Sequence, residues 1–296
     1  MSEAAETLSP PRTVREKVVL YLRMIDFHES VFSLPFAFVG ALLGSQGRLT
    51  AWQVFWIVVA MVGARTVALA FNRLIDVEFD ARNPRTAGAI LPRGLLSRGE
   101  VWLGILLAAG AYFLAAAQLN RLCLLLSPLA LAFIMFYSYT KRFTWWTHGV
   151  LGLALGLSPV AGWLAVAGRI ELPALVLGLA VATWVAGFDI IFALQDEEAD
   201  RQEGLYSIPA VFGRRAALIW SAAFHLLTVA FFAGAGLLLR LNLFYWLGVL
   251  LAAALLTVEH LIISVRDLSR LHTAYFRVNG LVSLLFLLCT WAAVRL

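Results

Sequence analysis

The chain is built from long apolar blocks separated by short polar breaks. Apolar runs of about 17–25 residues are long enough to cross the hydrocarbon core of a bilayer as helices. The pattern therefore predicts an all-α, polytopic membrane protein with nine transmembrane helices. The expected spans are residues 28–46, 51–75, 100–118, 120–138, 146–167, 172–192, 214–238, 242–263 and 274–294.

The segment before the first span has a different character. Residues 1–12 are polar and lack the basic, apolar and small-residue regions of a secretory signal. Val14–Phe27 mixes basic and apolar residues in a helix-like way, which predicts a helix lying in the membrane interface. We therefore expect a tail with an interfacial helix at residues 1–27 and a single transmembrane domain at 28–296.

Composition excludes a water-soluble domain. Hydrophobic residues make up 61% of the chain and charged residues 14%, whereas soluble domains carry about 25% charged residues. The net charge of +5 does not indicate a nucleic-acid partner, because basic residues in a membrane protein first report its orientation. Membrane lipid is the expected surrounding, and no feature of the sequence indicates an obligate protein partner.

The basic residues divide unequally between the two sides of the membrane. With nine spans, 17 Lys and Arg residues fall on the side of the N-terminus and five on the other side. The positive-inside rule then places the N-terminus and the two long loops, residues 80–99 and 195–213, in the cytoplasm. We expect an integral protein of a bacterial inner membrane whose working face is cytoplasmic.

Two spans end in acidic stripes. Asn72, Asp76 and Asp80 recur every four residues, so they lie along one face of a helix, with Arg65 about two turns deeper. At the sixth span, Asp189, Asp196 and Asp200 form a second stripe. Ionisable groups at membrane depth are costly and normally face a cavity or a partner.

These carboxylates need a positive partner between them. Oxygen ligands of this kind suit Mg²⁺, which prefers a few carboxylates together with water and phosphate oxygens. Two facing clusters could hold Mg²⁺ on a diphosphate, and nearby basic residues could complete its neutralisation. The basic residues on that side are Arg82, Arg85, Arg93, Lys141, Arg142 and Arg201.

Three motifs carry a resemblance to a known family. Asn72-x3-Asp76-x3-Asp80, Asp196-x3-Asp200 and Tyr137-x3-Lys141 resemble the motifs of the UbiA superfamily of membrane prenyltransferases. The string from Asn72 to Thr86, followed by Leu-Pro-Arg-Gly at 91–94, is similar to the 4-hydroxybenzoate polyprenyltransferase branch. A departure at residues 89–90, Ala-Ile where many relatives carry a basic residue, affects one diphosphate contact and leaves the chemistry unchanged.

The resemblance implies Mg²⁺-dependent transfer of a polyprenyl group from its diphosphate to a ring carbon of an aromatic acid. It implies a central cavity that opens to the cytoplasmic side, with a side opening for the isoprenoid tail. The residues expected to bind the metal are Asn72, Asp76, Asp80, Asp196 and Asp200. The residues expected to bind substrate are Arg65, Asn72, Arg85, Arg93 and Lys141, with Arg65 on the acceptor carboxylate. The residues expected to act in catalysis are Asp76, Asp189, Tyr137 and Lys141, with Asp189 stabilising the allylic cation or accepting the ring proton.

Two alternatives remain open. The acceptor could be a dihydroxynaphthoate of menaquinone synthesis in place of the 4-hydroxybenzoate of ubiquinone synthesis. A transporter with carboxylates inside the membrane is a different class, but transporters place such groups near the bilayer centre, whereas these lie at helix ends. The five histidines, His148 among them, are scattered without metal-ligand spacing and are interpreted as structural or interfacial. Glu203 is interpreted as part of a solvated helix end.

Overall fold

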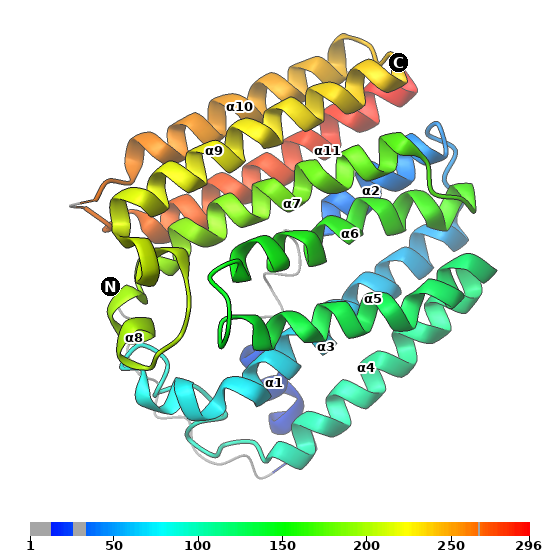
Figure 1. Cartoon of the computed structure of the whole chain (residues 1–296). Coiled ribbons are helices and arrows are strands. Elements are labelled where there is room, and N and C mark those ends of the chain that lie inside the picture. The colour runs from blue at the N-terminus through cyan, green and yellow to red at the C-terminus, as the bar shows by residue number, and fades with distance from the viewer. Residues whose placement is uncertain (1–12, 26–33, 266) are drawn as a thin grey trace.

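The computed structural model describes residues 13–25, 34–265 and 267–296, and the regular secondary structure of these ranges consists of helices joined by loops (Figure 1). The helices are α1 (Val14–Met24), α2 (Leu34–Gly44), α3 (Ala51–Arg82), α4 (Arg98–Leu119), α5 (Arg121–Thr140), α6 (Thr147–Ala167), α7 (Leu172–Ala193), α8 (Glu197–Gln202), α9 (Ile208–Leu239), α10 (Leu243–Ile262), the π-helical turn η2 (Thr273–Val278) and α11 (Asn279–Arg295).

Eight helices of the described chain are long and apolar enough to cross a membrane, with η2 and α11 counted as one. They correspond to the second to ninth predicted spans. The predicted first span, 28–46, corresponds to the shorter apolar helix α2, which has 11 residues, and its first part lies outside the described residues. The polytopic, all-helical prediction is confirmed, and the number nine is approximate.

Two spans are longer than their apolar blocks. Helix α3 continues seven residues past the predicted end at 75 and stops at Arg82, because Pro84 holds the preceding Asn83 in an extended conformation. Helix α9 starts at Ile208, but Gly213 has φ +80° and interrupts it. Only the part of α9 after Gly213 matches the predicted span at 214–238.

The helix starts are set by local sequence signals. Thr50 and Ser97 open α3 and α4 with capping boxes, in which each hydroxyl accepts from a backbone N–H and the N3 side chain returns the bond. Asn120 and Asn242 cap α5 and α10 through their side-chain oxygens. These caps satisfy backbone N–H groups that a helix leaves unpaired at its first turn.

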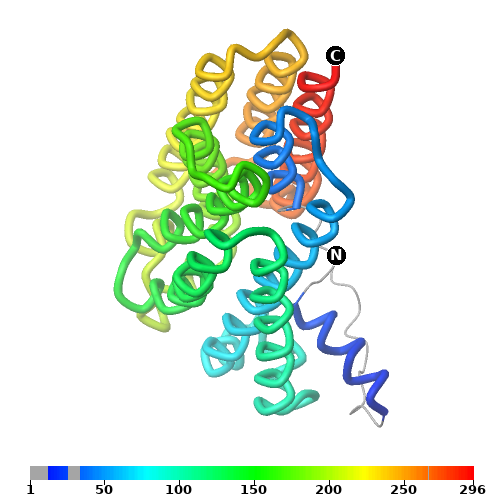
Figure 2. The backbone as a smooth tube through the Cα atoms, turned by 90° about the vertical axis from the view of Figure 1, so that its right-hand side faces the viewer, coloured from blue at the N-terminus to red at the C-terminus, as the bar shows by residue number. Residues whose placement is uncertain are grey.

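The core falls into two main groups of helices. Helix α7 is the most buried span, and it packs against α6 on one side and α9 on the other, while α2, α10 and α11 complete this group. A second apolar cluster joins α1, α3, α4 and α5. Figure 2 shows α1 at the edge of the bundle, where it buries Leu20 and Met24 and exposes Val14 and Val18.

Small residues bring α6 and α7 into close contact. Gly152 lies against the carbonyl oxygen of Ala182, and Gly156 lies against that of Gly178, so closely that an added Cβ would collide with either oxygen. Such spacing of small residues lets two helices approach without side chains between them. The close approach fixes the position of Asp189, near the end of α7, relative to His148, near the start of α6.

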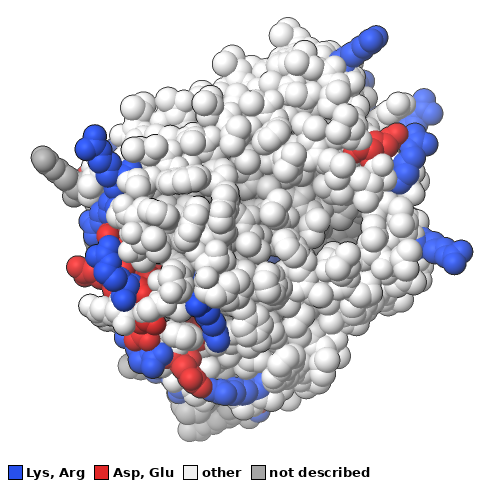
Figure 3. Space-filling model, in the orientation of Figure 1, with Lys and Arg blue, Asp and Glu red and all other residues white. Residues whose placement is uncertain are grey.

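The charged residues gather at the two ends of the helices, as Figure 3 shows for one face. Most of those visible lie at the end that carries α8, where acidic and basic side chains are mixed. The surface between the two ends is almost entirely uncharged in this view. Helices of this length and composition, with this distribution of charge, are those of an integral membrane protein.

Candidate active site

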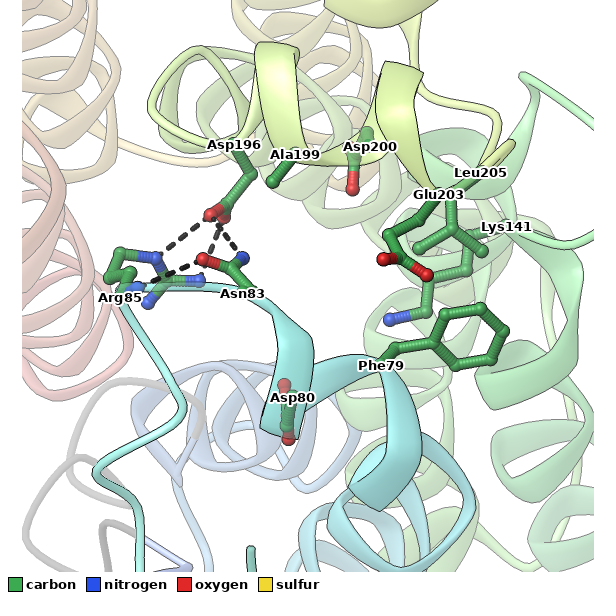
Figure 4. A pocket seen from close by; sticks show the side chains of 10 residues that line it. All are labelled: Phe79, Asp80, Asn83, Arg85, Lys141, Asp196, Ala199, Asp200, Glu203 and Leu205. Carbon is green, nitrogen blue, oxygen red and sulfur yellow. Dashed lines mark hydrogen bonds and ion pairs between the residues drawn. The ribbon is translucent and has the colours of Figure 1, made fainter.

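A pocket lies at the charged end, between the end of α3 and the short helix α8 (Figure 4). Its cavity volume is about 70 Å³. Asp80, Asp196, Asp200 and Glu203 contribute four carboxylates, and Arg85 and Lys141 contribute two cations. Phe79, Asn83, Ala199 and Leu205 complete the lining. The α3–α4 loop, the end of α5 and the segment after α7 thus meet at one place, as the motif order predicts.

Asp76 is the centre of an ion-pair network on α3. It is 2% exposed, and its Oδ2 lies 2.6 Å from Lys141 Nζ, while its Oδ1 accepts from Arg142 Nη2 at 3.2 Å. Asn72, one turn earlier, donates its amide to Asp76 Oδ2 at 3.2 Å. Arg142 also donates to the Ile75 carbonyl at 2.9 Å. The first acidic stripe is thereby connected to the Tyr-x3-Lys element of α5.

Asp196 is the equivalent centre on the other side of the pocket. Arg85 donates two hydrogen bonds to its carboxylate, from Nε to Oδ1 at 2.9 Å and from Nη2 to Oδ2 at 2.7 Å. Asn83 donates to the same Oδ1 at 3.1 Å. This paired geometry is the one a guanidinium uses for carboxylate or phosphate groups. The Arg85 guanidinium also lies 5.9 Å from the centre of the Phe192 ring.

Asp80 and Asp200 lie between these two networks. Asp80 is 3.9 Å from Arg73, a long ion-pair distance, and Thr86 donates to its backbone carbonyl at 3.0 Å. Asp200 points from α8 into the pocket, across from the α3 side (Figure 4). Burial raises the pKa of Asp200 above its ordinary value, and the Ser207 hydroxyl opposes this shift. A carboxylate in this position gains from a cation that enters the pocket.

The donor set fits Mg²⁺ held together with a phosphate. In residues 13–25, 34–265 and 267–296, no three or more His, Cys, Asp or Glu residues converge closely enough to hold a metal ion alone. The carboxylates instead stand on two walls with space between them. Mg²⁺ commonly takes one or two carboxylates plus waters and substrate phosphates, so a split set of oxygen ligands suits it.

Asp189 has a partner that sequence reasoning missed. Its Oδ2 lies 2.7 Å from Nδ1 of His148, which is 3% exposed, and the other ring nitrogen, Nε2, accepts from the backbone N–H of Ile208 at 3.2 Å. From the sequence, His148 is interpreted as structural or interfacial because the histidines show no metal-ligand spacing, and the 41 residues that separate it from Asp189 conceal the contact. Only the fold brings the two together.

Tyr137, one turn before Lys141 on α5, connects the two levels of the site. It is partly buried and lies within electrostatic range of Asp189, Asp76 and Asp200. The pocket and the deeper Asp189 are therefore neighbouring parts of one region.

Two residues expected to bind substrate, Arg65 and Arg93, do not line the pocket. Arg65 is partly buried on α3, two turns deeper than Asn72. Arg93 is exposed in the loop between α3 and α4 and is not one of the residues that line the cavity.

Glu203, expected to be solvated, instead forms part of the pocket wall and pairs with Arg82 at 2.8 Å. Asn83, also missed, lies three residues after Asp80 and lines the pocket.

The fold and the site define a helical membrane protein with a pocket for a charged ligand at the end of its bundle. The profile of the UbiA prenyltransferase family matches residues 33–289. The chain belongs to this family, as its motifs predict.

Several named relatives are similar over much of the chain. A 4-hydroxybenzoate octaprenyltransferase of Paraburkholderia phytofirmans is 30% identical over 280 residues, which cover 91% of this chain and 95% of the relative. One of Francisella tularensis subsp. novicida is 31% identical over 196 residues, 66% of this chain and 68% of its own.

Solved structures share the fold. The apo structure of a UbiA homolog from Aeropyrum pernix K1 has a TM-score of 0.80 and 34% identity, and the match covers 88% of this chain and 95% of that one. A UbiA homolog from Archaeoglobus fulgidus, solved bound to GPP and Mg²⁺, has a TM-score of 0.75 at 20% identity and covers 94% of this chain and 100% of that one. At 20% identity, the similarity to the Archaeoglobus fulgidus structure shows a shared fold.

Proposed function

We propose that this protein transfers a polyprenyl group from polyprenyl diphosphate to a ring carbon of 4-hydroxybenzoate, with Mg²⁺ as cofactor. The observation that carries the proposal is the pocket in which Asp80 faces Asp196 and Asp200, with Arg85 and Lys141 at its edges. Membership of the UbiA family and the names of the relatives support the same reaction.

Oxygen ligands for the metal come from both walls of the pocket. Asp80 would supply them from the α3 wall, with Asn72 and Asp76 beside it on the same face of α3, and Asp196 and Asp200 would supply them from the segment around α8. When bound there, Mg²⁺ neutralises charge on the diphosphate as it leaves.

Two cations act directly on the diphosphate. Lys141 and Arg85 are occupied by Asp76 and Asp196. With these carboxylates engaged by a metal ion, each cation would be able to exchange its carboxylate partner for a phosphate oxygen. Preformed positive groups of this kind stabilise the charge that develops on a leaving anion. Ionisation of the allylic substrate is thus favoured at the mouth of the pocket.

The acceptor binds deeper, toward the interior of the bundle. Arg65 is proposed to hold its carboxylate, since a guanidinium matches a carboxylate with two hydrogen bonds. Tyr137 and Asp189 then border the ring and the allylic cation. The surrounding helices exclude water, which would otherwise capture the cation.

We also propose the orientation of the protein. The concentration of basic residues on the side that holds α8 and the α3–α4 loop supports a cytoplasmic position for this side and for the N-terminus in a bacterial inner membrane. Both substrates would then reach the pocket from the cytoplasmic leaflet.

The test is an assay of the purified protein in detergent or liposomes. A polyprenyl diphosphate is offered with 4-hydroxybenzoate or with a dihydroxynaphthoate, with Mg²⁺ or with EDTA. The expected result is product from 4-hydroxybenzoate that disappears with EDTA and returns with excess Mg²⁺. Product from the naphthoate alone would move the protein to menaquinone synthesis, and no product from either acceptor would overturn the proposed reaction.

A further inference from the structure

Electrophilic attack on an aromatic ring leaves a proton that some group must remove. We propose that Asp189 is the base that takes this proton and that His148 is the residue that positions it. The inference rests on the proposed prenyl transfer and assigns the proton acceptor of that reaction. His148 enters as a positioning residue because it acts only through Asp189.

The hydrogen bonds of His148 define its tautomer. The backbone N–H of Ile208 can only donate, so the Nε2 atom that receives it at 3.2 Å carries a lone pair. The proton of the neutral ring therefore resides on Nδ1 and is donated to Asp189 Oδ2 at 2.7 Å. The Ile208 amide lies in the first turn of α9, where N–H groups lack partners within the helix. The start of α9 thus sets the tautomer of His148.

This arrangement leaves one carboxylate oxygen for chemistry. Asp189 Oδ2 is held by His148, whereas Oδ1 accepts no hydrogen bond from the described part of the chain. The Asp189 side chain is 18% exposed, while that of His148 is 3% exposed. The carboxylate therefore keeps an accessible surface, whereas the histidine behind it does not. His148 itself is unsuited as the base because both of its nitrogens are engaged.

The position of Asp189 suits the removal of a ring proton. It lies on the last turn of α7, before the loop that carries Asp196, and is therefore deeper than the diphosphate pocket. Tyr137 lies within electrostatic range of both Asp189 and Asp76. In the proposed reaction, the allylic carbon beside the diphosphate bonds to the acceptor ring. The ring carbon that gains the prenyl group would then lie near Asp189.

The step balances without an additional reactant. The bond between the allylic carbon and the diphosphate oxygen breaks, and that carbon forms a new bond to the ring. The attacked ring carbon then loses its proton to Asp189 Oδ1, and the C–H electron pair restores aromaticity. The products are the prenylated acid, diphosphate and a protonated Asp189, which passes its proton to water as the products leave.

The role of His148 follows from the charge that changes on Asp189. Its Nδ1–H stabilises the carboxylate and holds it in one rotamer, as a second residue commonly does for a general base. His148→Ala removes this donor, whereas His148→Asn keeps an N–H close to the Nδ1 position. We expect the Asn variant to recover part of the rate that the Ala variant loses.

The experiment measures the isotope effect for 4-hydroxybenzoate deuterated at the ring carbons next to the hydroxyl group, competed against unlabelled acceptor. In the wild type, proton loss follows the slow ionisation step, and we expect an isotope effect close to one. In Asp189→Asn, we expect transfer to slow by about 10²–10⁴-fold, with a primary isotope effect in the residual product. In His148→Ala, we expect a smaller loss of about 10–100-fold and the same isotope effect.

Two controls separate this inference from a general loss of structure. Thr147→Val alters the buried residue next to His148 without touching Asp189 and should leave the isotope effect at the wild-type value. The Mg²⁺-dependent affinity for geranyl diphosphate should be unchanged in both His148 variants. If Asp189→Asn yields no product, the isotope effect in His148→Ala tests the assignment of the base.

The outcomes are distinct. A wild-type protein that transfers no prenyl group overturns the proposed function together with this inference. Transfer by the wild type, combined with an isotope effect near one in the Asp189 and His148 variants, overturns the assignment of the base alone. An isotope effect that appears in these variants, and is smaller in His148→Asn than in His148→Ala, supports it.

Discussion

Two regions of the molecule gather polar residues inside an otherwise apolar bundle, and they are built differently. The first is the pocket network around Asp76 and Asp196 at the charged end. The second is a cluster between α7, α9, α10 and α11, which we call the Glu259 cluster. It consists of Glu259, Asn279, Trp184, His225 and His260.

The Glu259 cluster is closed and linked by short bonds. Glu259 is 0% exposed and accepts from the Asn279 amide at 3.0 Å, while Trp184 Nε1 donates to the Asn279 oxygen at 2.7 Å. The Asn279 amide also donates to the Ala274 carbonyl at 3.2 Å, which secures the π-helical turn η2. His225 and His260 bond to each other at 2.9 Å.

The pocket network is open and charged. Lys141 and Arg142, the partners of Asp76, have side chains that are 30% and 32% exposed. Such groups can exchange one charged partner for another, because water reaches them during the exchange. The Glu259 cluster has neither the cations nor the access to do so. This difference in access supports ligand binding at the pocket network and a role in helix packing for the Glu259 cluster.

The largest expected effect comes from Asp76→Ala. The change removes an expected metal ligand and the partner of Lys141, and loss of an electrostatic group of this kind costs about 10²–10³-fold in kcat. The melting temperature should stay near that of the wild type, because Lys141 and Arg142 are exposed enough to remain hydrated. Prenyl transfer by the purified variant measures the effect. A rate within about tenfold of the wild type, which corresponds to about 1.4 kcal/mol of activation free energy, would show that Asp76 does not take part in the reaction.

The second effect is on stability, from Glu259→Ala. The change leaves the buried Asn279 donor without this acceptor, which costs about 1–3 kcal/mol of unfolding free energy. Glu259→Gln keeps an acceptor oxygen and should cost less. Thermal unfolding in detergent distinguishes the two, at about 2–4 °C per kcal/mol for a chain of roughly this size. Equal melting of Glu259→Ala and the wild type would show that the cluster does not hold the helices together.

A smaller effect is expected from Arg85→Ala. Hydrogen bonds to charged groups contribute about 1.5–3 kcal/mol, so the KM for polyprenyl diphosphate should rise by about tenfold or more. Arg201→Ala is the matched control, because Arg201 pairs with Glu197 on the same short helix and does not line the pocket. Steady-state kinetics with the diphosphate varied tests both. An equal effect in the two variants would contradict a direct contact by Arg85.

The smallest effect is expected from Arg169→Ala at the opposite end of the bundle. Arg169 pairs with Glu171 at 3.0 Å, but its side chain is 73% exposed, and exposed pairs of this kind contribute about 0–1 kcal/mol. Melting temperature and transfer rate should both match the wild type. A marked loss of transfer would show that function also depends on charges at that end.

Sequence patterns predicted those parts of the molecule that depend on local spacing. The long helices followed from apolar runs, and the facing of Asn72, Asp76 and Asp80 followed from the helical repeat. The sequence predicted the pairing of Lys141 with the first acidic stripe only in part. The motif resemblance placed Lys141 and Asp76 at one site, but it did not predict the contact between them. Spacing along a single helix was thus sufficient to predict many of the polar residues at the pocket.

The remaining parts depend on contacts between distant segments. His148 meets Asp189 across 41 residues and Ile208 across 60, and nothing in its neighbourhood along the chain indicates either contact. Glu203 has the surroundings of a solvated residue, yet α8 folds over the pocket and places it in the wall. The π-helical turn η2 depends on the Asn279 amide, whose partners lie on other helices as well as its own.

The most direct test of the pocket is the binding of geranyl diphosphate to the purified protein, measured by isothermal titration calorimetry with and without Mg²⁺. We predict binding that requires Mg²⁺, is abolished by EDTA and is lost in Asp196→Ala, while Glu259→Gln binds like the wild type. Binding that is independent of Mg²⁺ or unaffected by the loss of Asp196 would contradict the account.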